Sequence, residues 1–292
     1  MKTLRYFLEA TLLYILFAFF SALSPEKASN IGGWIGRTIG PKLATNRKAR
    51  RNLTFAMPDI DENKQNEIII GMWDNLGRVI AEYPHLERIS RDHTVIENKG
   101  RLASLLESQQ PIVFFGGHLA NWEVNSTALL TQYDKKIALT YRAPNNPWTA
   151  KLLDKARTLN GRLVAFPKSR ESGKDILQTL RKGGALGILI DQKYNEGIDV
   201  PFFSLPAMTN PIFVQLCQKY KCPLVPVKNQ RLSGCSFKLT PYPPLALFDK
   251  DDQPRPVEDV IKEAHTLLET WISDKPEQWI WLHRRWKDTT AT

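Results

Sequence analysis

The sequence predicts an α/β fold: a mostly parallel central sheet flanked by helices, with a membrane-anchoring helix at the N-terminus. From residue 111 onward, short apolar runs alternate with segments of helical periodicity. Strands that alternate with helices of about ten or more residues are typical of βαβ units, which build parallel sheets. At the N-terminus, an apolar stretch without charges is followed by a cluster of basic residues.

The composition is that of a folded globular protein. The 292 residues are 42% hydrophobic and 24% charged, which excludes a disordered chain and a multi-span membrane protein. Three cysteines are too few for a disulfide framework and fit a reducing compartment. We expect residues 1–24 to form the anchor and residues 25–292 one domain, with a helical part at 25–100 and an α/β part at 101–292.

The apolar stretch at the N-terminus has borderline length for a membrane span. Residues 10–23 carry no charge, and Tyr6 to Leu8 extend the stretch beyond Glu9. A bilayer core needs about 20 apolar residues, so the segment fits a short or tilted span, an interfacial helix or the apolar region of a signal peptide. Residues 21–23 make a poor cleavage site, which disfavours the signal peptide.

The segment between Pro25 and Arg51 is strongly basic. Against a single Glu26 it holds Lys27, Arg37, Lys42, Arg47, Lys48, Arg50 and Arg51. Each Lys or Arg near an anionic bilayer gains about 1 kcal/mol, so the cluster suits a membrane surface better than a merely solvated face. The positive-inside rule then places the rest of the chain in the cytoplasm.

The other elements follow in order along the chain. Residues 62–83 carry apolar side chains three and four apart, which predicts a helix. Strands are expected at residues 112–115, 137–140, 163–166, 185–190 and 224–227, with helices between them at 121–132, 148–159, 173–181 and 210–220. A strand at 236–239, a proline-rich loop at 241–256 and a helix at 257–272 complete the domain.

The segment with the clearest chemical signal follows the strand at 112–115. Gly116 and Gly117 permit a tight turn, which places His118 at the carboxyl end of the strand, where α/β sheets build their sites. In one regular helix the side chains of His118 and Glu123 would point about 140° apart. If His118 lies on the turn, its ring can fold back onto Glu123, which fixes the tautomer while the other nitrogen accepts a proton from an alcohol. The alternative is an ordinary histidine beside a helix-terminal carboxylate.

Further polar residues are expected at the same sheet edge. Arg142 follows the strand at 137–140 and can stabilise a thioester oxyanion or clamp a phosphate; the alternative is a surface arginine. Asp191 ends the strand at 185–190 and can orient Arg142 or His118, unless it only forms a turn.

Arg157 is a second candidate cation, and the sequence also permits a metal site. Arg157 lies in an expected helix, where it can pair with Asp154 or Glu171. A metal held by His118, Glu123 and Asp191 is disfavoured, because the other histidines show no ligand spacing. These are His85, His93, His265 and His283.

Four segments, in order over most of the chain, carry a family resemblance: residues 116–123, residues 141–147, residues 191–192 with 201–211, and residues 281–286. Together they resemble the lipid A biosynthesis lauroyl/myristoyl acyltransferases of the lysophospholipid acyltransferase superfamily, which implies a glycerolipid acyltransferase-like fold. Ala120 and Ser204 stand where most of the family has glycine.

The resemblance implies transfer of a fatty acyl group, usually from acyl carrier protein, to a hydroxyl of a lipid A precursor at the cytoplasmic face of the inner membrane. It implies that His118 is the general base and Glu123 its partner, without a covalent acyl-enzyme, and with an acyl thioester as co-substrate but no cofactor or metal. The residues expected to contact substrate are Arg142, Asp191, Asn121 and Arg157. Phe202, Phe203, Met208 and Phe213 can line an acyl channel, although apolar residues at such spacing usually form core.

Other functions remain open from the sequence. The same motifs occur in enzymes that acylate other glycolipids or lysophospholipids. A thioesterase would use the same pair on water, but no Gly-x-Ser-x-Gly elbow supports its serine version. The formal net charge of +10 also fits a membrane-tethered nucleic-acid binder. Because no Walker A, zinc-finger or RNP motif accompanies that charge, we expect an anionic membrane and an acidic carrier protein as partners, and no nucleic acid.

Overall fold

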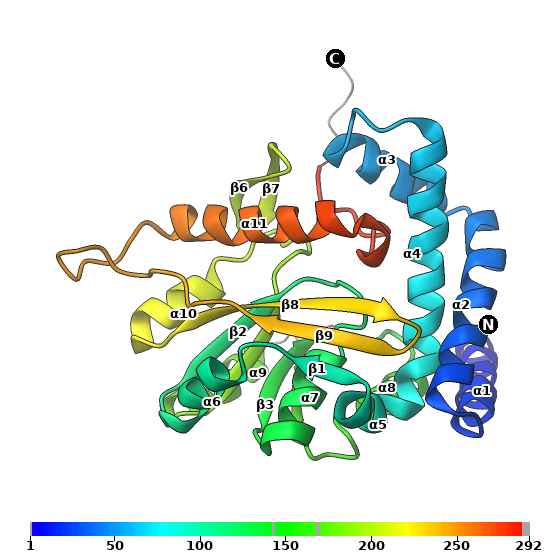
Figure 1. Cartoon of the computed structure of the whole chain (residues 1–292), viewed down its shortest axis with the longest axis horizontal. Helices are drawn as coiled ribbons and strands as arrows, with labels where there is room; N and C mark the ends of the chain where they lie inside the picture. The colour runs from blue at the N-terminus through cyan, green and yellow to red at the C-terminus, as the bar shows by residue number, and fades with distance from the viewer. Residues whose placement is uncertain (1, 142–143, 168–169, 288–292) are drawn as a thin grey trace.

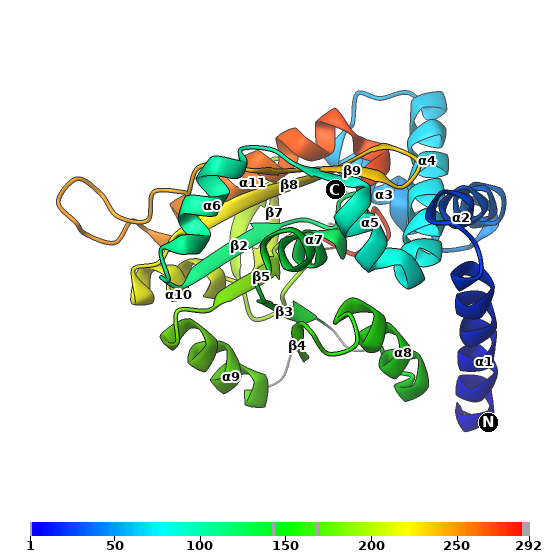
Figure 2. The ribbon, with the colours of Figure 1, turned by 60° about the horizontal axis from the view of Figure 1, so that its bottom comes forward.

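The computed structural model describes residues 2–141, 144–167 and 170–287. Its centre is a seven-stranded sheet in the order β1-β9-β8-β2-β5-β3-β4. Figure 1 labels β1, β9, β8, β2 and β3, and Figure 2 labels β5 and β4. The strands are β1 (Thr94–Ile96), β2 (Ile112–Gly116), β3 (Ile137–Tyr141), β4 (Val164–Pro167), β5 (Ala185–Leu189), β8 (Leu224–Ser233) and β9 (Ser236–Pro241). Every neighbouring pair is parallel except β8 and β9. The prediction of a mostly parallel sheet is confirmed.

Three strands were not predicted. β1 lies within the stretch 25–100, which we expected to be helical, and it pairs with β9 at the edge of the sheet. β6 (Ile198–Phe202) and β7 (Leu205–Thr209) form a separate hairpin. Its two turn residues, Phe203 and Ser204, have left-handed φ values of 50° and 60°. Such turns are usually signalled by Asn-Gly or Asp-Gly, and neither dipeptide stands at this turn.

Helices cover both faces of the sheet. They are α5 (Leu86–Asp92), α6 (Lys99–Glu107), α7 (Val124–Tyr133), α8 (Pro147–Arg157), α9 (Arg170–Arg181), α10 (Ile212–Tyr220) and α11 (Val257–Asp274). β2 is buried along its whole length because its side chains alternate between the two faces. Ile112 and Phe114 belong to the core that includes α5, α6 and α7, whereas Val113 and Phe115 belong to the core that includes α10 and α11.

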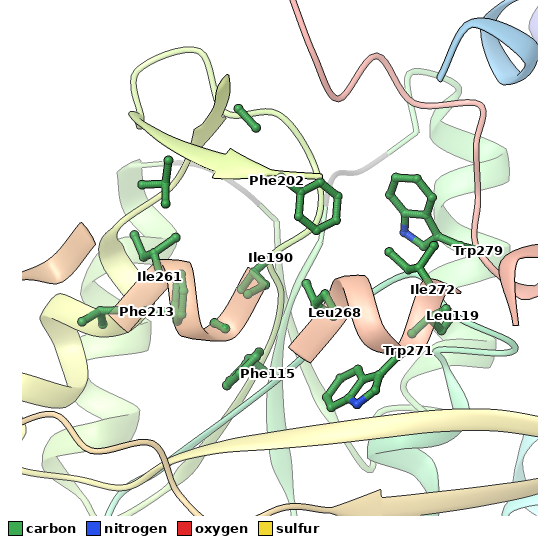
Figure 3. Close-up of a cluster of buried hydrophobic side chains, with 14 of the residues drawn as sticks. Phe115, Leu119, Ile190, Phe202, Phe213, Ile261, Leu268, Trp271, Ile272 and Trp279 are labelled. Carbon is green, nitrogen blue, oxygen red and sulfur yellow. The ribbon is translucent and has the colours of Figure 1, made fainter. Parts of the chain in front are cut away.

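The core on the α11 side is rich in aromatic rings (Figure 3). Phe115 lies opposite the apolar side of α11, and the fully buried Phe202 of the hairpin packs against Trp279 with ring centroids 6.0 Å apart. Burying a side chain of this size stabilises the fold by about 1.5–3 kcal/mol. The hairpin and the C-terminal segment are therefore fixed to the same core as the sheet.

The N-terminal part consists of helices α1 (Lys2–Ser21), α2 (Pro25–Ile39), α3 (Asn46–Ala56) and α4 (Glu62–Glu82). α2 packs closely on α4 because glycines line their contact. A Cβ atom added to Gly36 would lie 2.0 Å from the carbonyl oxygen of Trp73, and one added to Gly77 would lie 2.1 Å from that of Gly32. Any larger residue at these positions would push the two helices apart.

α1 is a candidate membrane anchor. Within the described residues, one helix, Thr3–Ser21, is long and apolar enough to cross a membrane, judged by length and composition. It lies at one end of the molecule and projects beyond the sheet (Figure 2). Its solvent-exposed large apolar side chains are Leu4, Phe7, Leu8, Leu12, Tyr14, Ile15 and Phe19. One polar contact to the α/β part is the hydrogen bond from Asn146 Nδ2 to the carbonyl oxygen of Tyr6, at 2.8 Å.

Candidate active site

The loop after β2 carries the candidate base. β2 ends at Gly116 and α7 begins at Val124, three residues later than expected, so residues 117–123 form a loop. Ala120 adopts a left-handed φ of 51°, and its N–H donates to the carbonyl oxygen of Gln278 at 2.8 Å. Glycine reaches this backbone conformation at lower cost than alanine. This gives a physical reason for the glycine that most of the family has where Ala120 stands.

Asp191 holds His118 through two hydrogen bonds. The Nδ1 atom of His118 lies 2.7 Å from Asp191 Oδ1, and the backbone N–H of His118 donates to Oδ2, also at 2.7 Å. Trp279 Nε1 donates to the same Oδ2 at 2.7 Å. This contact follows from topology, because β2 and β5 are parallel neighbours and both residues follow the carboxyl ends of those strands. Of the two partners that the sequence left open for Asp191, the structure places it on the histidine. Asp191 is not among the described residues that line the cavity, so its expected contact with substrate does not fit.

The Asp191 carboxylate is ionised in its buried position. Only 2% of the residue is exposed. Burial by itself raises the pKa of this carboxyl, but attraction to the His118 ring and the hydrogen bonds from His118 and Trp279 outweigh it. The pKa therefore lies well below its usual range. An ionised carboxylate at Nδ1 requires a proton on that nitrogen, so in the neutral imidazole the other ring nitrogen, Nε2, carries the lone pair.

The Nε2 atom of His118 faces the side chain of Gln192. The Gln192 Nε2 atom lies 3.1 Å from His118 Nε2 and 3.0 Å from the Nε2 atom of His283, in the C-terminal segment. Trp122 packs beside the His118 ring with centroids 5.2 Å apart. The candidate base is therefore enclosed by a neighbour on its own loop and by two groups from distant parts of the sequence.

Glu123 pairs with Arg157 and not with His118. Arg157 donates twice to the carboxylate, from Nε at 2.8 Å and from Nη2 at 2.7 Å, and the Tyr83 hydroxyl donates to it at 2.7 Å. Burial raises the pKa of Glu123, but the Arg157 charge and these hydrogen bonds lower it by more. The net pKa lies below its usual value, so the carboxylate is ionised. Burial also raises the pKa of Tyr83, which therefore keeps its proton and remains a donor.

The expected contact between the His118 ring and Glu123 is therefore wrong in this structure. A carboxylate does hold the imidazole, but it comes from Asp191, after β5. Asp154 and Glu171 were the expected partners of Arg157, but its guanidinium pairs with Glu123 and lies over the Tyr141 ring, 4.8 Å from the centroid. Neither change could be deduced from spacing along the chain.

Two further expected site residues have different outcomes. Asn121 is fully buried; its Nδ2 donates to Glu82 at 2.8 Å, and its Oδ1 accepts the backbone N–H of Glu123 at 3.2 Å. It is not part of the cavity wall that the described residues form, so the expected contact with substrate does not fit. Arg142 lies outside the described residues.

A cavity of about 480 Å³ adjoins these groups. That volume falls within the range of roughly 300–1,000 Å³ that is usual for small-molecule sites. Its polar lining includes His118, Glu123, Arg157, Gln192 and His283. Its apolar lining comes largely from β2, β3, β5 and α7 and includes Phe114, Phe115, Leu129, Ile137, Leu139, Ile188 and Leu189. The arrangement can hold an apolar chain with a polar end beside the imidazole.

The phenylalanines expected to line an acyl channel belong to the core. Phe202 and Phe213 are buried, and Phe202 stacks on Trp286 with centroids 5.9 Å apart and an interplanar angle of 23°. With Phe203 and Met208, they are not among the described residues that line the cavity. Arg285 fixes the hairpin by donating to the carbonyl oxygen of Met208 at 2.8 Å. The C-terminal motif therefore has a structural part at residues 285–286 and a part at the site, His283.

The described structure does not bring together the disfavoured metal set of His118, Glu123 and Asp191, because Glu123 is engaged by Arg157. Side chains of metal-binding type meet elsewhere. Glu26, His93 and Cys235 have candidate ligand atoms within 4.8 Å of one another, at the start of α2.

Sequence reasoning gave no role to several groups at the site. Trp279 and Gln192 contact the His118–Asp191 pair through hydrogen bonds, the His283 ring lies 5.5 Å from the His118 ring between centroids, and Tyr83 contacts Glu123. Gln192 and His283 lie in the segments that carried the family resemblance, which was a usable signal. Trp279 and Tyr83 had no comparable signal.

A carboxylate-held imidazole at the carboxyl edge of a mostly parallel sheet, next to an apolar cavity, defines a class of protein: one equipped for base-assisted chemistry on a substrate with an apolar chain. Residues 1–288 match the family described as bacterial lipid A biosynthesis acyltransferase. The chain belongs to this family, and the resemblance seen in the sequence is confirmed. Membership supports acyl transfer to lipid A.

Individual relatives agree with the family. The chain is 26% identical over 249 residues to the lipid A biosynthesis lauroyltransferase of Escherichia coli (strain K12), covering 81% of this chain and 77% of the relative. It is 23% identical over 271 residues to the lipid A biosynthesis palmitoleoyltransferase of the same strain, covering 88% and 84%. A lipid A biosynthesis acyltransferase of Shigella flexneri matches with the same identity and coverage.

Proposed function

We propose that the protein is a membrane-associated O-acyltransferase of the late lipid A type. It moves a fatty acyl group from an acyl thioester, carried by acyl carrier protein, to a hydroxyl of a lipid A precursor. The observation that carries the mechanism is the hydrogen bond of 2.7 Å between His118 Nδ1 and Asp191 Oδ1, beside the apolar cavity.

His118 acts as the general base. Its Nε2 takes the proton of the acceptor hydroxyl as the oxygen forms a bond to the thioester carbon. The tetrahedral intermediate then collapses, the C–S bond breaks, and the proton passes from His118 to the leaving thiolate. Asp191 keeps the proton on Nδ1 and stabilises the imidazolium that forms between the two steps. The reaction needs neither a covalent acyl-enzyme nor a cofactor.

Glu123 has a positioning role in this proposal. It ties the loop of His118 to Arg157 of α8 and Tyr83, and so holds one wall of the cavity. Arg157 has 14% of its side chain exposed, in the cavity lining, where its charge can attract an anionic group of the acceptor. We assign Arg142, which follows β3, to the same task. Asn121 stabilises the loop through its buried hydrogen bonds with Glu82 and the backbone of Glu123.

The proposed donor fits the charge and packing of α3. This helix carries Arg47, Lys48, Arg50 and Arg51. Asn52 of the same helix donates to the carbonyl oxygen of Trp281 at 2.7 Å, next to the segment that bears His283. A basic helix beside the site would attract an acidic carrier protein and orient it on approach.

The proposed location is the cytoplasmic face of the inner membrane, with α1 as a single anchor. The apolar side chains of α1 are exposed, and the basic residues of α2 and α3 follow it directly. The positive-inside rule supports the cytoplasmic orientation.

Mass spectrometry of lipids tests the proposed acceptor. Cells with the wild-type chain, with His118→Ala and without the chain are compared. We expect a gain of one fatty acyl unit on lipid A in the wild type alone. A gain on a phospholipid or another glycolipid would show that this lipid, and not a lipid A precursor, is the acceptor. No gain on any lipid would contradict the proposal.

A further inference from the structure

The C-terminal segment brings a second histidine to the candidate base. One amide nitrogen, Gln192 Nε2, lies 3.1 Å from His118 Nε2 and 3.0 Å from His283 Nε2. The two imidazole centroids are 5.5 Å apart, and all three side chains line the cavity. A primary amide has two N–H bonds, which is one for each ring.

Asp191 determines which way this amide points. Its carboxylate keeps the proton on His118 Nδ1, so His118 Nε2 offers a lone pair and requires a donor. The –NH2 group of Gln192 therefore faces His118, and its second N–H points at His283 Nε2. His283 accepts this hydrogen bond and so fixes the orientation of the amide.

We propose that Gln192 is a further catalytic residue, which donates a hydrogen bond to the oxyanion of the tetrahedral intermediate, and that His283 is the positioning residue that aims it. The inference rests on the proposed acyl transfer. Without substrate, Gln192 occupies the lone pair of His118. The acceptor hydroxyl must take that place before it can lose its proton, and its arrival frees one N–H of Gln192.

The freed N–H is in the right region for the oxyanion. The attacking oxygen and the oxyanion are bonded to the same carbon, and Gln192 starts one hydrogen-bond length from the base. As the O–H bond breaks and the C–O bond forms, the electron pair of the thioester C=O moves to its oxygen. An N–H donor about 2.7–3.1 Å from that oxygen stabilises the charge until the C–S bond breaks and C=O re-forms.

Several other donors near the base already serve the two carboxylates. The side chains that donate to Glu123 are Arg157, Tyr83 and Trp122. The groups that donate to Asp191 are the backbone N–H of His118 and Trp279 Nε1. Gln192 differs from them because its hydrogen bond to the base is exchanged when the hydroxyl binds.

Gln192→Leu tests the donor, with Gln215→Leu on the exposed side of α10 as the matched control. We expect kcat for acyl transfer to fall about 100-fold in Gln192→Leu and to stay unchanged in the control. A non-reactive thioether analogue of the acyl donor should bind the wild type and Gln192→Leu equally, because no oxyanion forms on it. Loss of analogue binding together with kcat would show a merely structural role and overturn the proposal.

Two substitutions of His283 test the positioning role. His283→Phe keeps an aromatic ring but removes the Nε2 acceptor, and should lower kcat about ten-fold. His283→Gln places an amide oxygen near the Nε2 position and should restore most of the activity. Equal impairment in both variants would refute the positioning role.

The outcome for the wild type separates this inference from the proposed function. If the wild type transfers acyl groups and Gln192→Leu keeps kcat within about three-fold, the oxyanion role is wrong and the acyltransferase stands. If the wild type transfers none, both fail.

Discussion

Replacing Asp191 by asparagine tests the tautomer of His118 with a change of one atom. Two donors, the His118 backbone N–H and Trp279 Nε1, each lie 2.7 Å from Asp191 Oδ2. They force the oxygen of the asparagine into the Oδ2 position, so its –NH2 group takes the Oδ1 position and faces His118 Nδ1. That nitrogen must then accept, the ring proton moves to Nε2, and the base loses its lone pair.

We expect Asp191→Asn to lower kcat for acyl transfer about 10⁴-fold, the size of loss that a wrong histidine tautomer causes in a serine protease triad. At 1.36 kcal/mol per factor of ten, this equals about 5.4 kcal/mol of transition-state stabilisation. The assay measures initial rates with purified full-length protein, an acyl carrier protein thioester and a lipid A precursor in detergent micelles. Asp175→Asn, on the exposed side of α9, makes the same chemical change away from the site.

Thermal unfolding establishes that the Asp191→Asn protein is folded before its rates are compared. A folded variant that keeps more than about a tenth of the wild-type kcat would refute the role assigned to Asp191.

Three further predictions concern stability. Glu123→Gln leaves the buried Arg157 charge without a counter-charge and should lower the free energy of unfolding by about 3 kcal/mol in urea titration; adding Arg157→Met should restore most of it. Ser204→Gly relieves a φ of 60° in the exposed turn of the hairpin and should add about 0.5–1 kcal/mol. Burial and the Arg285 charge lower the pKa of His265 from 6.5 to about 4, so below pH 6.5 the unfolded chain binds a proton that the folded chain does not. About 3 kcal/mol of stability, present above pH 6.5, should be lost as the pH falls to 4, and His265→Gln should flatten that slope.

Each of these has a clear contrary result. A double variant at Glu123 and Arg157 as unstable as the single one would contradict the ion-pair argument. A lower unfolding temperature for Ser204→Gly would speak against strain in the turn. The same pH slope with and without His265 would assign the acid sensitivity to other groups.

Most of the sheet could be predicted because its strands are short apolar runs that end in turn residues. The runs at 112–115 and 185–190 correspond to β2 and β5, and the carboxyl-edge rule placed His118 and Asp191 on one side of the sheet. The rule does not give strand order. That β2 and β5 are neighbours, which brings Asp191 to the imidazole, emerges only from the folded topology.

The contacts that could not be predicted span long stretches of chain. Trp279 and His283 reach the site because the C-terminal segment returns across the sheet edge and forms a β-bridge at Leu119. Nothing in the local sequence around Glu123 indicates that its partner is Arg157 of α8. Such pairs depend on the packing of whole elements, and periodicity along the chain does not encode them.

The most direct measurement is the fate of the acyl group when purified protein meets an acyl carrier protein thioester with and without a lipid A precursor. With the precursor, the wild type should form one new ester per thioester consumed, and His118→Ala should form almost none while remaining folded. Release of free fatty acid alone, at the same rate with or without the precursor, would show a thioesterase. Ester formation by His118→Ala at the wild-type rate would show that His118 is not the general base.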